Sequence, residues 1–389
     1  MLRSISQASR RPPSRYGTGS AAGRLVRSAP LRPWLTLLGL SLLVKALVVT
    51  VTLVEFGASP DPLTALGRAW DQWDAQHYLY LSTHGYAATG DARNLIAFFP
   101  LYPAVVGTVA AIGLPVRLAA LLISNLAGIA ATILLFEVVR LDGDERVAWR
   151  AAALFTVFPT AYFLLVGYTE ALFCALAFGA VLAARRRQWL PAGALGGLAA
   201  ATRLTGLALL PLLLLEIYTH RRSVKHAWQA AAAPLLVAGG FLLYLATNWL
   251  VLKDPFAFVA VQRVHWSHRL APPWTGFTEA VHSLFWRVPW ERLTVGAGEI
   301  LGGISAYAVT VLSWIRLEPA DAAYAAALTV MVTFLPFWLS IPRYLLSLYP
   351  LFWLAGRVRN RWIQGIAVAL SFTGLITFSL AFSRGYWAF

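Results

Sequence analysis

Long apolar runs, each close to the length of a membrane crossing, recur along the chain and restrict it to one class of fold. The clearest runs cover residues 34–56, 116–139 and 228–252. A helix needs roughly 20 apolar residues to cross the hydrocarbon core of a bilayer. Only 13% of the 389 residues are charged, against about 25% in ordinary soluble domains. The sequence therefore predicts an all-α polytopic membrane protein.

The basic segments predict how these spans are oriented, because cytoplasmic loops of membrane proteins are enriched in Lys and Arg. Apart from the N-terminal tail, they are the arginine triplet 185–187, "HRRSVK" at 220–225 and "RVRNR" at 357–361. All four lie in the cytoplasm if the chain makes about eleven crossings, with the N-terminus inside and the C-terminus outside. Residues 98–113 then lie at the outer interface or enter the bilayer part-way. The rival layout makes 98–113 a full span and fuses residues 190–218 into one span. It leaves the arginine triplet outside, which argues against it.

The chain divides into a basic tail and one membrane domain. Residues 1–32 contain seven arginines and no acidic residue, a composition typical of a disordered cytoplasmic tail. Residues 33–389 form the membrane domain, with outer loops at 57–115 and 253–294. The tail and the short loops hold most of the net charge of +15, so the charge reflects membrane orientation and no nucleic-acid partner is expected. Lys45 interrupts the first span and either snorkels to the interface or faces the bundle interior.

The first outer loop carries the segment "WDAQHYLYLSTHGY" at 73–86. Asp71 and Asp74 are three residues apart, so a helix would place both carboxylates on one face, and His77 would continue that face one turn later. Together with Trp73, these groups would form a general base in a cleft with aromatic walls. The alternative is an amphipathic interfacial helix with a solvated polar face.

Three charged residues lie within apolar surroundings. Glu170 stands at the top of an apolar helix pair, Arg203 lies in "TRLTG", and Arg343 begins a span in "PRY". A charge in such a place is costly unless it has a partner or a ligand. The planar guanidinium groups of Arg203 and Arg343 suit a phosphate. The alternatives are polar contacts between helices for Glu170 and Arg203, and snorkelling to the interface for Arg343.

The second outer loop is rich in tryptophan and histidine. Aromatic side chains such as Trp266 suit the apolar faces of a sugar or a lipid headgroup, although an interfacial aromatic belt has the same composition. The pair His265 and His268 is weak support for a metal site on its own. The sequence has neither a glycine-rich phosphate loop nor an HExxH motif. We therefore expect no coupling to ATP. No metal or cofactor is expected either, since Arg203 and Arg343 together suit a phosphate.

Five motifs occur in order between residues 73 and 352: "WDAQHYLYLSTHGY" with "FFPLYP", "FPTAYFLLVGYTEALF", "TRLTG", "QRVHW" and "PRYLLSLYPLF". In these motifs the chain resembles the GT-C glycosyltransferases, and more narrowly the GPI mannosyltransferase 2 (PIG-V) family and its prokaryotic relatives. The first pair of motifs is the most specific, whereas "TRLTG" and "PRY" are short. The resemblance implies a GT-C type bundle with interfacial helices in the first outer loop.

The resemblance also implies a reaction. A hexose, with mannose expected, passes with inversion from a polyprenyl-phosphate-linked donor to a hydroxyl of a glycolipid, lipoglycan or protein acceptor at the extracytoplasmic or lumenal face. Asp74 matches the acidic catalytic position of the first outer loop, and Glu170 matches the acidic position of the second. His77 stands where an aromatic or hydrophobic residue is commoner in the family. The residues expected to contact substrate are Asp71, Trp73, His77, Glu170, Arg203, Gln262, His265, Trp266, Arg343 and Tyr344.

Two other classes of function stay open. The first is a polytopic lipid or sugar transporter or flippase, and the second is a non-catalytic accessory subunit. Transporters often contain inverted repeats and broken helices at the midplane, whereas this chain shows no repeat and gathers its polar residues in two outer loops. As an enzyme, the protein is expected in the bacterial plasma membrane, or in the endoplasmic reticulum membrane if it is eukaryotic, with its active site facing away from the cytoplasm.

Overall fold

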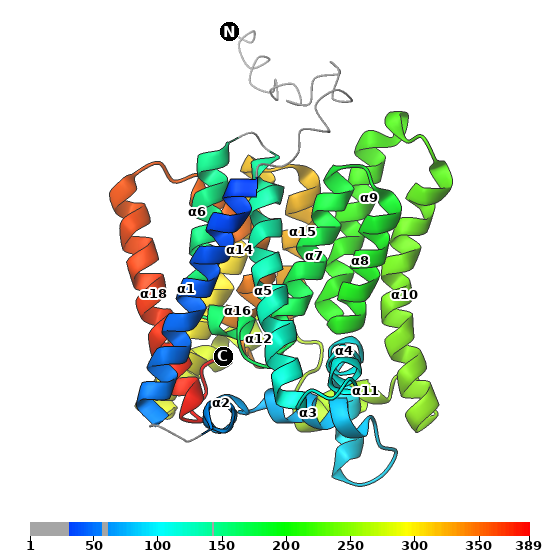
Figure 1. Ribbon diagram of the computed structural model, residues 1–389. Coiled ribbons are helices and arrows are strands. Elements are labelled where there is room, and N and C mark those ends of the chain that lie inside the picture. The colour runs from blue at the N-terminus through cyan, green and yellow to red at the C-terminus, as the bar shows by residue number, and fades with distance from the viewer. Residues whose placement is uncertain (1–30, 57–60, 142–143) are drawn as a thin grey trace, which may run out of the picture. The chain divides into compact units, whose positions relative to one another are not determined.

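The structure is a computed structural model of the chain. It describes residues 31–56, 61–141 and 144–389, so nearly all of the expected basic tail lies outside the described residues. Residues from Leu37 onward form one unit, to which the following description applies. Within the described residues every regular element is a helix (Figure 1). The all-α architecture expected from the apolar runs is therefore confirmed.

Long apolar helices form part of the bundle. Five helices of the described residues are long and apolar enough to cross a membrane, or six if one bent pair is counted as a single span. They are α1 (Leu31–Phe56), α5 (Val116–Arg140), α10 (Ala227–Leu252), the segment Pro289–Arg316 that ends in α14 (Glu299–Arg316), and α18 (Arg361–Ser383). The remaining apolar helices are shorter, so the expected count of about eleven crossings is not confirmed.

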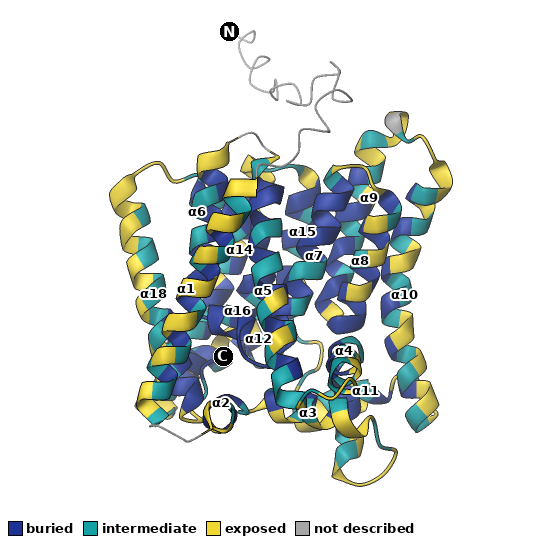
Figure 2. Cartoon of the chain, viewed as in Figure 1, coloured by how far each residue is buried: buried dark blue, intermediate teal, exposed yellow. Residues whose placement is uncertain are grey.

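Shorter helices pack between the long ones. They are α6 (Glu145–Thr156), α7 (Glu170–Arg185), α8 (Trp189–Thr202), α9 (Leu209–His220), α15 (Pro319–Thr333) and α17 (Tyr349–Gly356). Figure 2 shows α7 largely buried along its length, whereas α10 and α18 expose many side chains. Small residues allow α8 and α10 to approach closely, since a Cβ added to Gly240 would lie 1.8 Å from the carbonyl oxygen of Gly197.

The two ends of this helical unit carry different segments. In Figure 1 the connections α7–α8, α9–α10 and α17–α18 lie at one end, and these connections are the three basic loops. The α9–α10 connection includes the short helix η5 (Arg221–Ser223). At the other end lie α2 (Pro62–Trp70), α3 (Asp74–His84), α4 (Leu101–Ala110) and α11 (Ala257–His265). The basic loops therefore share one end, as the expected topology requires.

The two long outer loops are mostly helical. The first contains α2, α3, η2 (Asp91–Ala97) and α4, and the second contains α11, α12 (Pro273–Trp286), α13 (Pro289–Glu291) and the π-helical turn η6 (Arg292–Gly298). Figure 1 shows α2 and α3 lying crosswise to the long helices, as expected of interfacial helices. η2 and α4 meet at an angle of 115°, across a break that contains Pro100, and proline disfavours a continuous helix. Within 98–113 the one helix, α4, has 10 residues, which is too short to cross a bilayer.

Several helices are broken, and the breaks position charged residues. The breaks are η3 (Ala161–Leu164) after α6, η4 (Leu204–Ala208) after α8, and α16 (Ile341–Tyr344) with η7 (Leu345–Ser347) after α15. Arg203 lies between α8 and η4, and Arg343 lies in α16. Glu170 is the first residue of α7, shortly after η3. The three charges expected to be costly within apolar surroundings therefore all lie at or near helix ends.

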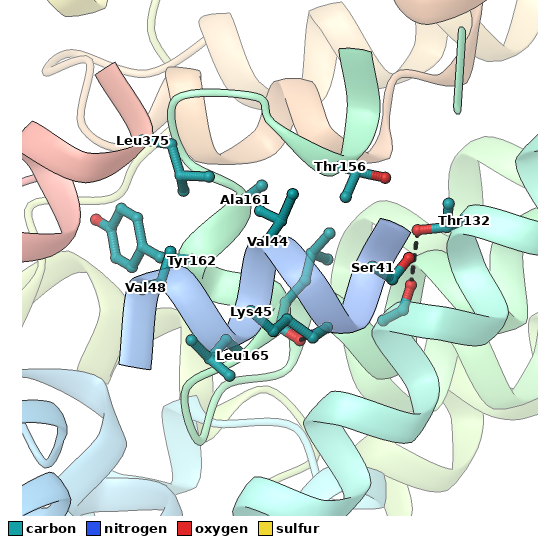
Figure 3. A pocket seen from close by; sticks show the side chains of 12 residues that line it. Ser41, Val44, Lys45, Val48, Thr132, Thr156, Ala161, Tyr162, Leu165 and Leu375 are labelled. Atoms are coloured by element: carbon teal, nitrogen blue, oxygen red, sulfur yellow. Dashed lines mark hydrogen bonds between the residues drawn. The ribbon is translucent and has the colours of Figure 1, made fainter. Parts of the chain in front are cut away.

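Lys45 faces the interior of the bundle. Its ammonium group donates a hydrogen bond of 2.5 Å to the carbonyl oxygen of Leu164. Figure 3 shows Lys45 with Ser41 and Thr132 in the wall of a small cavity of about 20 Å³. Because Leu164 ends η3, the lysine supplies a donor to a carbonyl at a helix break. Of the two placements expected for Lys45, the interior one is confirmed.

Candidate active site

Asp71 and Asp74 do not share one helical face. α2 ends at Trp70 and α3 begins at Asp74, so the two acids flank a break. Trp73 lies in this break with a φ of 52°, which no residue of a right-handed helix adopts. The expected stripe is therefore wrong for Asp71, because sequence spacing defines a face only within an unbroken helix, whereas Asp74 and His77 are three residues apart within α3.

Asp71 forms an ion pair with Arg117. Its Oδ2 accepts hydrogen bonds of 2.8 and 2.6 Å from Nε and Nη2 of Arg117 in α5. Gly67 in α2 leaves the room for this contact, since a Cβ there would lie 2.3 Å from Cζ of Arg117. The ion pair ties the end of α2 to α5. A substrate contact by Asp71 stays a prediction.

Asp74 belongs to a chain of four alternating charges. Its Oδ2 lies 3.3 Å from Nη1 of Arg343, and Nε of Arg343 lies 3.1 Å from Oε1 of Glu170. The same oxygen of Glu170 accepts a hydrogen bond from Nη1 of Arg203. Arg203 also donates to the hydroxyl of Thr169 at 2.7 Å. Four charges that are far apart in the sequence thus form one contact network, called the open cluster below.

The open cluster is accessible at Asp74. The side chain of Asp74 is 25% exposed, whereas those of Arg343 and Glu170 are 9% and 4% exposed. Two guanidinium groups face two carboxylates, so the cluster is neutral when both acids are ionised. Buried charges are tolerated only when they are paired in this way. A ligand can therefore reach the cluster through its one partly exposed acid.

Local backbone structure holds the two arginines in place. Arg203 follows α8 with extended dihedral angles (φ −154°, ψ 146°), so it leaves the helical path. Arg343 lies in α16, where two amides at the start of the helix donate to the buried carboxylate of Glu299 at 2.6 and 2.8 Å. That carboxylate satisfies amides that a helix start leaves unpaired and so positions Arg343. The ring of Tyr344 lies 4.7 Å from Cζ of Arg203, within the range of a cation–π contact.

Aromatic rings from both outer segments meet beside α3. The ring centroid of Phe98 lies 5.2 Å from those of His77 and Tyr78, and 5.6 Å from that of Trp266. Gln262 precedes Trp266 by one turn of α11, and its Oε1 is buried without a hydrogen-bond partner among the described residues. The site thus has an aromatic wall and an unused acceptor, both of which suit a sugar.

His268 lies within electrostatic reach of the open cluster. Burial lowers the pKa of its imidazole below the ordinary 6.5, and the positive charge of Arg343 lowers it further, whereas Asp74 acts in the opposite direction. The amide of His268 donates to the carbonyl oxygen of Gln262 at 3.0 Å, which holds the residue against the end of α11. His268 is therefore neutral over a wider pH range than a free histidine.

The structure brings most of the expected residues together and separates a few. The open cluster and its aromatic wall contain Asp74, His77, Glu170, Arg203, Gln262, Trp266, Arg343 and Tyr344. Trp73 instead packs edge-on against Trp387, with centroids 5.1 Å apart. His265 is exposed, and its ring contacts only Trp266 among the described aromatic residues.

Three further residues of the site were not expected as substrate contacts: Tyr168, Thr169 and His268. Tyr168 places its ring 5.6 Å from Cζ of Arg343 and donates its hydroxyl to the carbonyl oxygen of Gln72 at 3.0 Å. The one sequence signal for Tyr168 and Thr169 is adjacency, since they directly precede Glu170. Adjacency alone does not distinguish a site residue from a spacer.

The chemistry that the site offers follows from these contacts. In the described part of the chain, no three His, Cys, Asp or Glu side chains are grouped so that they could hold a metal ion. Each carboxylate of the open cluster already faces a guanidinium group. The site therefore presents a partly exposed carboxylate at its open end and cationic groups behind it.

Part of this chain is similar in sequence to known proteins. Residues 64–247, slightly less than half of the chain, match the family described as mannosyltransferase (PIG-V). GPI alpha-1,6-mannosyltransferase 2 of Mus musculus is 33% identical over 176 residues, which cover 42% of this chain and 34% of the mouse protein. GPI mannosyltransferase 2 of Drosophila pseudoobscura pseudoobscura is 29% identical over 129 residues, which cover 30% of this chain and 27% of the fly protein. The chain thus spans about a third of the length of these curated relatives, and the resemblance to PIG-V proteins is confirmed.

A solved structure supports the fold. The crystal structure of ArnT from Cupriavidus metallidurans bound to undecaprenyl phosphate is 18% identical, with a TM-score of 0.52 over 88% of this chain and 64% of the ArnT chain. At this identity the likeness concerns the fold alone, and the helical bundle resembles that of ArnT. The PIG-V match contains Asp74, Glu170 and Arg203 but ends before Arg343. Since Arg343 joins Asp74 to Glu170, the site extends beyond the matched region.

Proposed function

We propose that this chain, which resembles the PIG-V mannosyltransferases over residues 64–247, is a membrane glycosyltransferase. It transfers a hexose, with mannose as the expected sugar, from a polyprenyl-phosphate-linked donor to an acceptor hydroxyl, with inversion. The observation that carries this proposal is the partly exposed carboxylate of Asp74, 3.3 Å from the buried Arg343. Support for the donor class comes from ArnT, which shares the fold and is bound to undecaprenyl phosphate in its crystal structure.

Asp74 acts as the general base. The acceptor oxygen forms a bond to the anomeric carbon while its proton passes to a carboxylate oxygen of Asp74. The bond between the anomeric carbon and the phosphate oxygen breaks, and the polyprenyl phosphate leaves with the electron pair. Attack from the side opposite to the leaving group inverts the configuration of the anomeric carbon.

The arginines respond to the same proton transfer. In the resting cluster, Arg343 is matched by both Asp74 and Glu170. Once Asp74 takes up the proton it no longer neutralises Arg343, and negative charge grows on the leaving phosphate at the same moment. Arg343, supported by Arg203, then stabilises the transition state more than the ground state. Because the leaving group is a monophosphate, two guanidinium groups serve in place of a metal ion.

The reaction takes place at the extracytoplasmic or lumenal surface. The three basic loops lie at the end of the bundle opposite to α3 (Figure 1), and such loops are enriched on the cytoplasmic side. Accessibility labelling of Asp74→Cys tests this placement, with the natural Cys174 buried and thus a low background. We expect an impermeant thiol reagent to reach position 74 from outside the cytoplasm. Labelling from the cytoplasmic side alone contradicts the proposal.

Sugar transfer in membranes tests the activity itself. Membranes that contain the chain are incubated with radiolabelled polyprenyl-phosphate-mannose, and lipid and protein fractions are examined for label. We expect a new labelled product with the wild-type chain and none with Asp74→Asn. The anomeric configuration of the product tests inversion, and activity that survives EDTA tests metal independence.

Other outcomes of the same assay favour the alternative functions. Movement of intact donor between the leaflets, without any labelled product, favours a flippase. Binding of the donor without transfer by the wild-type chain favours an accessory subunit. Activity that EDTA abolishes and manganese restores contradicts the role given to the arginines, while leaving the reaction class intact.

A further inference from the structure

The segment that carries Trp266 and His268 also lines a second cavity. This basic cavity has a volume of about 560 Å³ and is lined by Arg263, Ser267, Arg269, Glu279, Arg287, Pro336 and Phe337. The small cavities at Lys45 and Asp71 measure about 20 and 10 Å³. A volume of several hundred Å³ is in the range of small-molecule sites. The basic cavity can therefore hold a ligand of the size of a phosphorylated sugar or a lipid headgroup.

The basic cavity has a surplus of positive charge, unlike the open cluster. Arg287 pairs with Glu291 at 3.2 Å. No carboxylate of the described residues lies within ion-pair distance of Arg263 or Arg269, although Glu279 lines the same cavity. In the open cluster, by contrast, every guanidinium group faces an acid. Unmatched guanidinium groups around a cavity suit an anion, and phosphate accepts their paired hydrogen bonds.

The surroundings of the basic cavity suit a lipid. α12 lines it through Glu279 and exposes large apolar side chains along its length, among them Trp274 at 67% and Trp286 at 87%. In proteins that cross a membrane, tryptophans are enriched at the level of the headgroups. An anion bound among these arginines can thus remain attached to a tail in the bilayer.

We propose that the basic cavity binds the phosphate group of a lipid substrate before the reaction begins. The lipid nature of the ligand rests on the proposed function, whereas the phosphate site rests on the cavity and its charges. The two pairs of arginines have different roles because their charges are matched differently. Arg203 and Arg343 are neutralised until Asp74 takes up a proton, so they add little to ground-state affinity. Arg263 and Arg269 are unmatched at rest, and they supply that affinity.

Direct binding to the purified full-length chain tests the proposal. The probe is radiolabelled undecaprenyl phosphate in neutral detergent, with undecaprenol, phosphatidylinositol and inorganic phosphate as competitors. Each of Arg263→Gln and Arg269→Gln is expected to weaken binding at least about tenfold, the usual effect of losing a hydrogen bond to a charged group. Arg269→Lys keeps the positive charge but loses the planar guanidinium group. Its affinity is expected to lie between those of the wild type and Arg269→Gln. Arg93→Gln, at an exposed arginine of η2, is the matched control and should bind as wild type.

The competitors distinguish the sources of phosphate. Binding of undecaprenyl phosphate that undecaprenol does not displace supports a phosphate site. Stronger competition by phosphatidylinositol supports the same site and assigns it to the acceptor instead of the donor. Inorganic phosphate that competes as well as the lipids overturns the lipid assignment. Wild-type binding by the Arg263→Gln, Arg269→Gln double variant overturns the proposal, even if sugar transfer is established, and loss of binding without any transfer supports it independently of the enzyme activity.

Discussion

Two buried groups of charges lie at opposite ends of α7, and they differ in access. The open cluster includes Glu170, the first residue of α7, and a second group includes Arg185, its last. In this closed cluster, Arg185 lies 2.5 Å from Asp321 and 3.1 Å from Glu216, and Tyr349 donates a hydrogen bond to Asp321. An acid at the start of a helix and a base at its end both suit the helix dipole. The same helix thus anchors two ion networks for similar reasons.

The difference between the clusters shows what distinguishes a site from a structural contact. Asp321 is fully buried and Glu216 is 3% exposed, whereas Asp74 is 25% exposed. In the closed cluster two carboxylates share one arginine, so no cation is left for an anionic ligand. Buried ion pairs are ordinary structural elements. In the proposed reaction, the open cluster works because its exposed acid can take up a proton and so release a matched arginine.

The largest expected effect is on turnover, from Asp74→Asn. The amide keeps the shape of the side chain but cannot take up the acceptor proton, so we expect turnover to fall on the order of 100- to 10,000-fold. The unfolding temperature should change little, because Asp74 is partly exposed. Rates of sugar transfer and thermal unfolding in detergent measure the two effects. Asp91→Asn, at an exposed acid of η2, serves as the control, and full activity of Asp74→Asn with loss in Asp71→Asn assigns the base to Asp71.

Asp321→Ala is expected to lower stability and to leave turnover unchanged, the reverse of Asp74→Asn. It leaves Arg185 with Glu216 alone and removes the acceptor of Tyr349. Breaking a buried pair in this way lowers the free energy of unfolding by about 3–5 kcal/mol. Turnover per folded molecule should stay near wild type. Glu55→Ala, which breaks an exposed pair with Arg384, is the control and should cost less than about 1 kcal/mol. Loss of turnover without loss of stability in Asp321→Ala contradicts the distinction between the open and closed clusters.

Arginine-to-lysine substitutions sharpen the same comparison. Arg343 contacts Asp74 through Nη1 and Glu170 through Nε, and a lysine ammonium cannot reproduce this geometry. We expect Arg343→Lys to lower kcat on the order of 10- to 100-fold, the effect of losing one hydrogen bond to a charged group. KM should change less, because Arg343 is released only as the reaction proceeds. Arg185→Lys should lower stability and leave kcat near wild type, and an equal loss of kcat in both variants contradicts the different roles.

The members of the open cluster can be identified from the sequence, but their contacts cannot. Glu170, Arg203 and Arg343 stand out because each is a charge within apolar surroundings, which is costly without a partner. Their partners depend on how η4 and α16 interrupt the helices, and a sequence does not specify the direction in which a chain leaves a break. Trp73 illustrates the limit. Its positive φ separates Asp71 from Asp74, yet a large aromatic residue gives no warning of such a backbone.

The outer segments were harder to predict than the bundle. Residues 253–293 look like a polar loop because tryptophan, histidine and proline interrupt the apolar pattern, yet they contain α11 and α12. A helix at an interface needs only one apolar face, so its hydropathy is lower than that of a span. The basic loops predict that their connections share one side of the membrane, and Figure 1 places all three at one end of the bundle. They do not predict the number of crossings, because broken helices shorten the apolar runs that would be counted.

The smallest expected effects are on stability as a function of pH, and the two clusters should respond with opposite signs. His268, beside the open cluster, has a pKa lowered by burial, so the unfolded chain takes up a proton near pH 6.5 that the folded chain does not. Stability is then lost as the pH falls below 6.5. His220, in the basic loop beside the closed cluster, has a pKa raised by its hydrogen bond to Glu216. Its contribution is present below 6.5 and is lost as the pH rises through the folded-state pKa.

Thermal unfolding across this pH range separates the two contributions. His268→Gln should remove part of the loss of stability on the acidic side and leave the alkaline side unchanged. His220→Gln should remove part of the loss above pH 6.5 and leave the acidic side unchanged. Burial and the guanidinium group of Arg343 disfavour the charged form of His268. The carboxylate of Glu216, by contrast, favours the charged form of His220. Identical pH profiles for the two variants contradict the electrostatic difference between the open and closed clusters, even if the effects on turnover and stability hold.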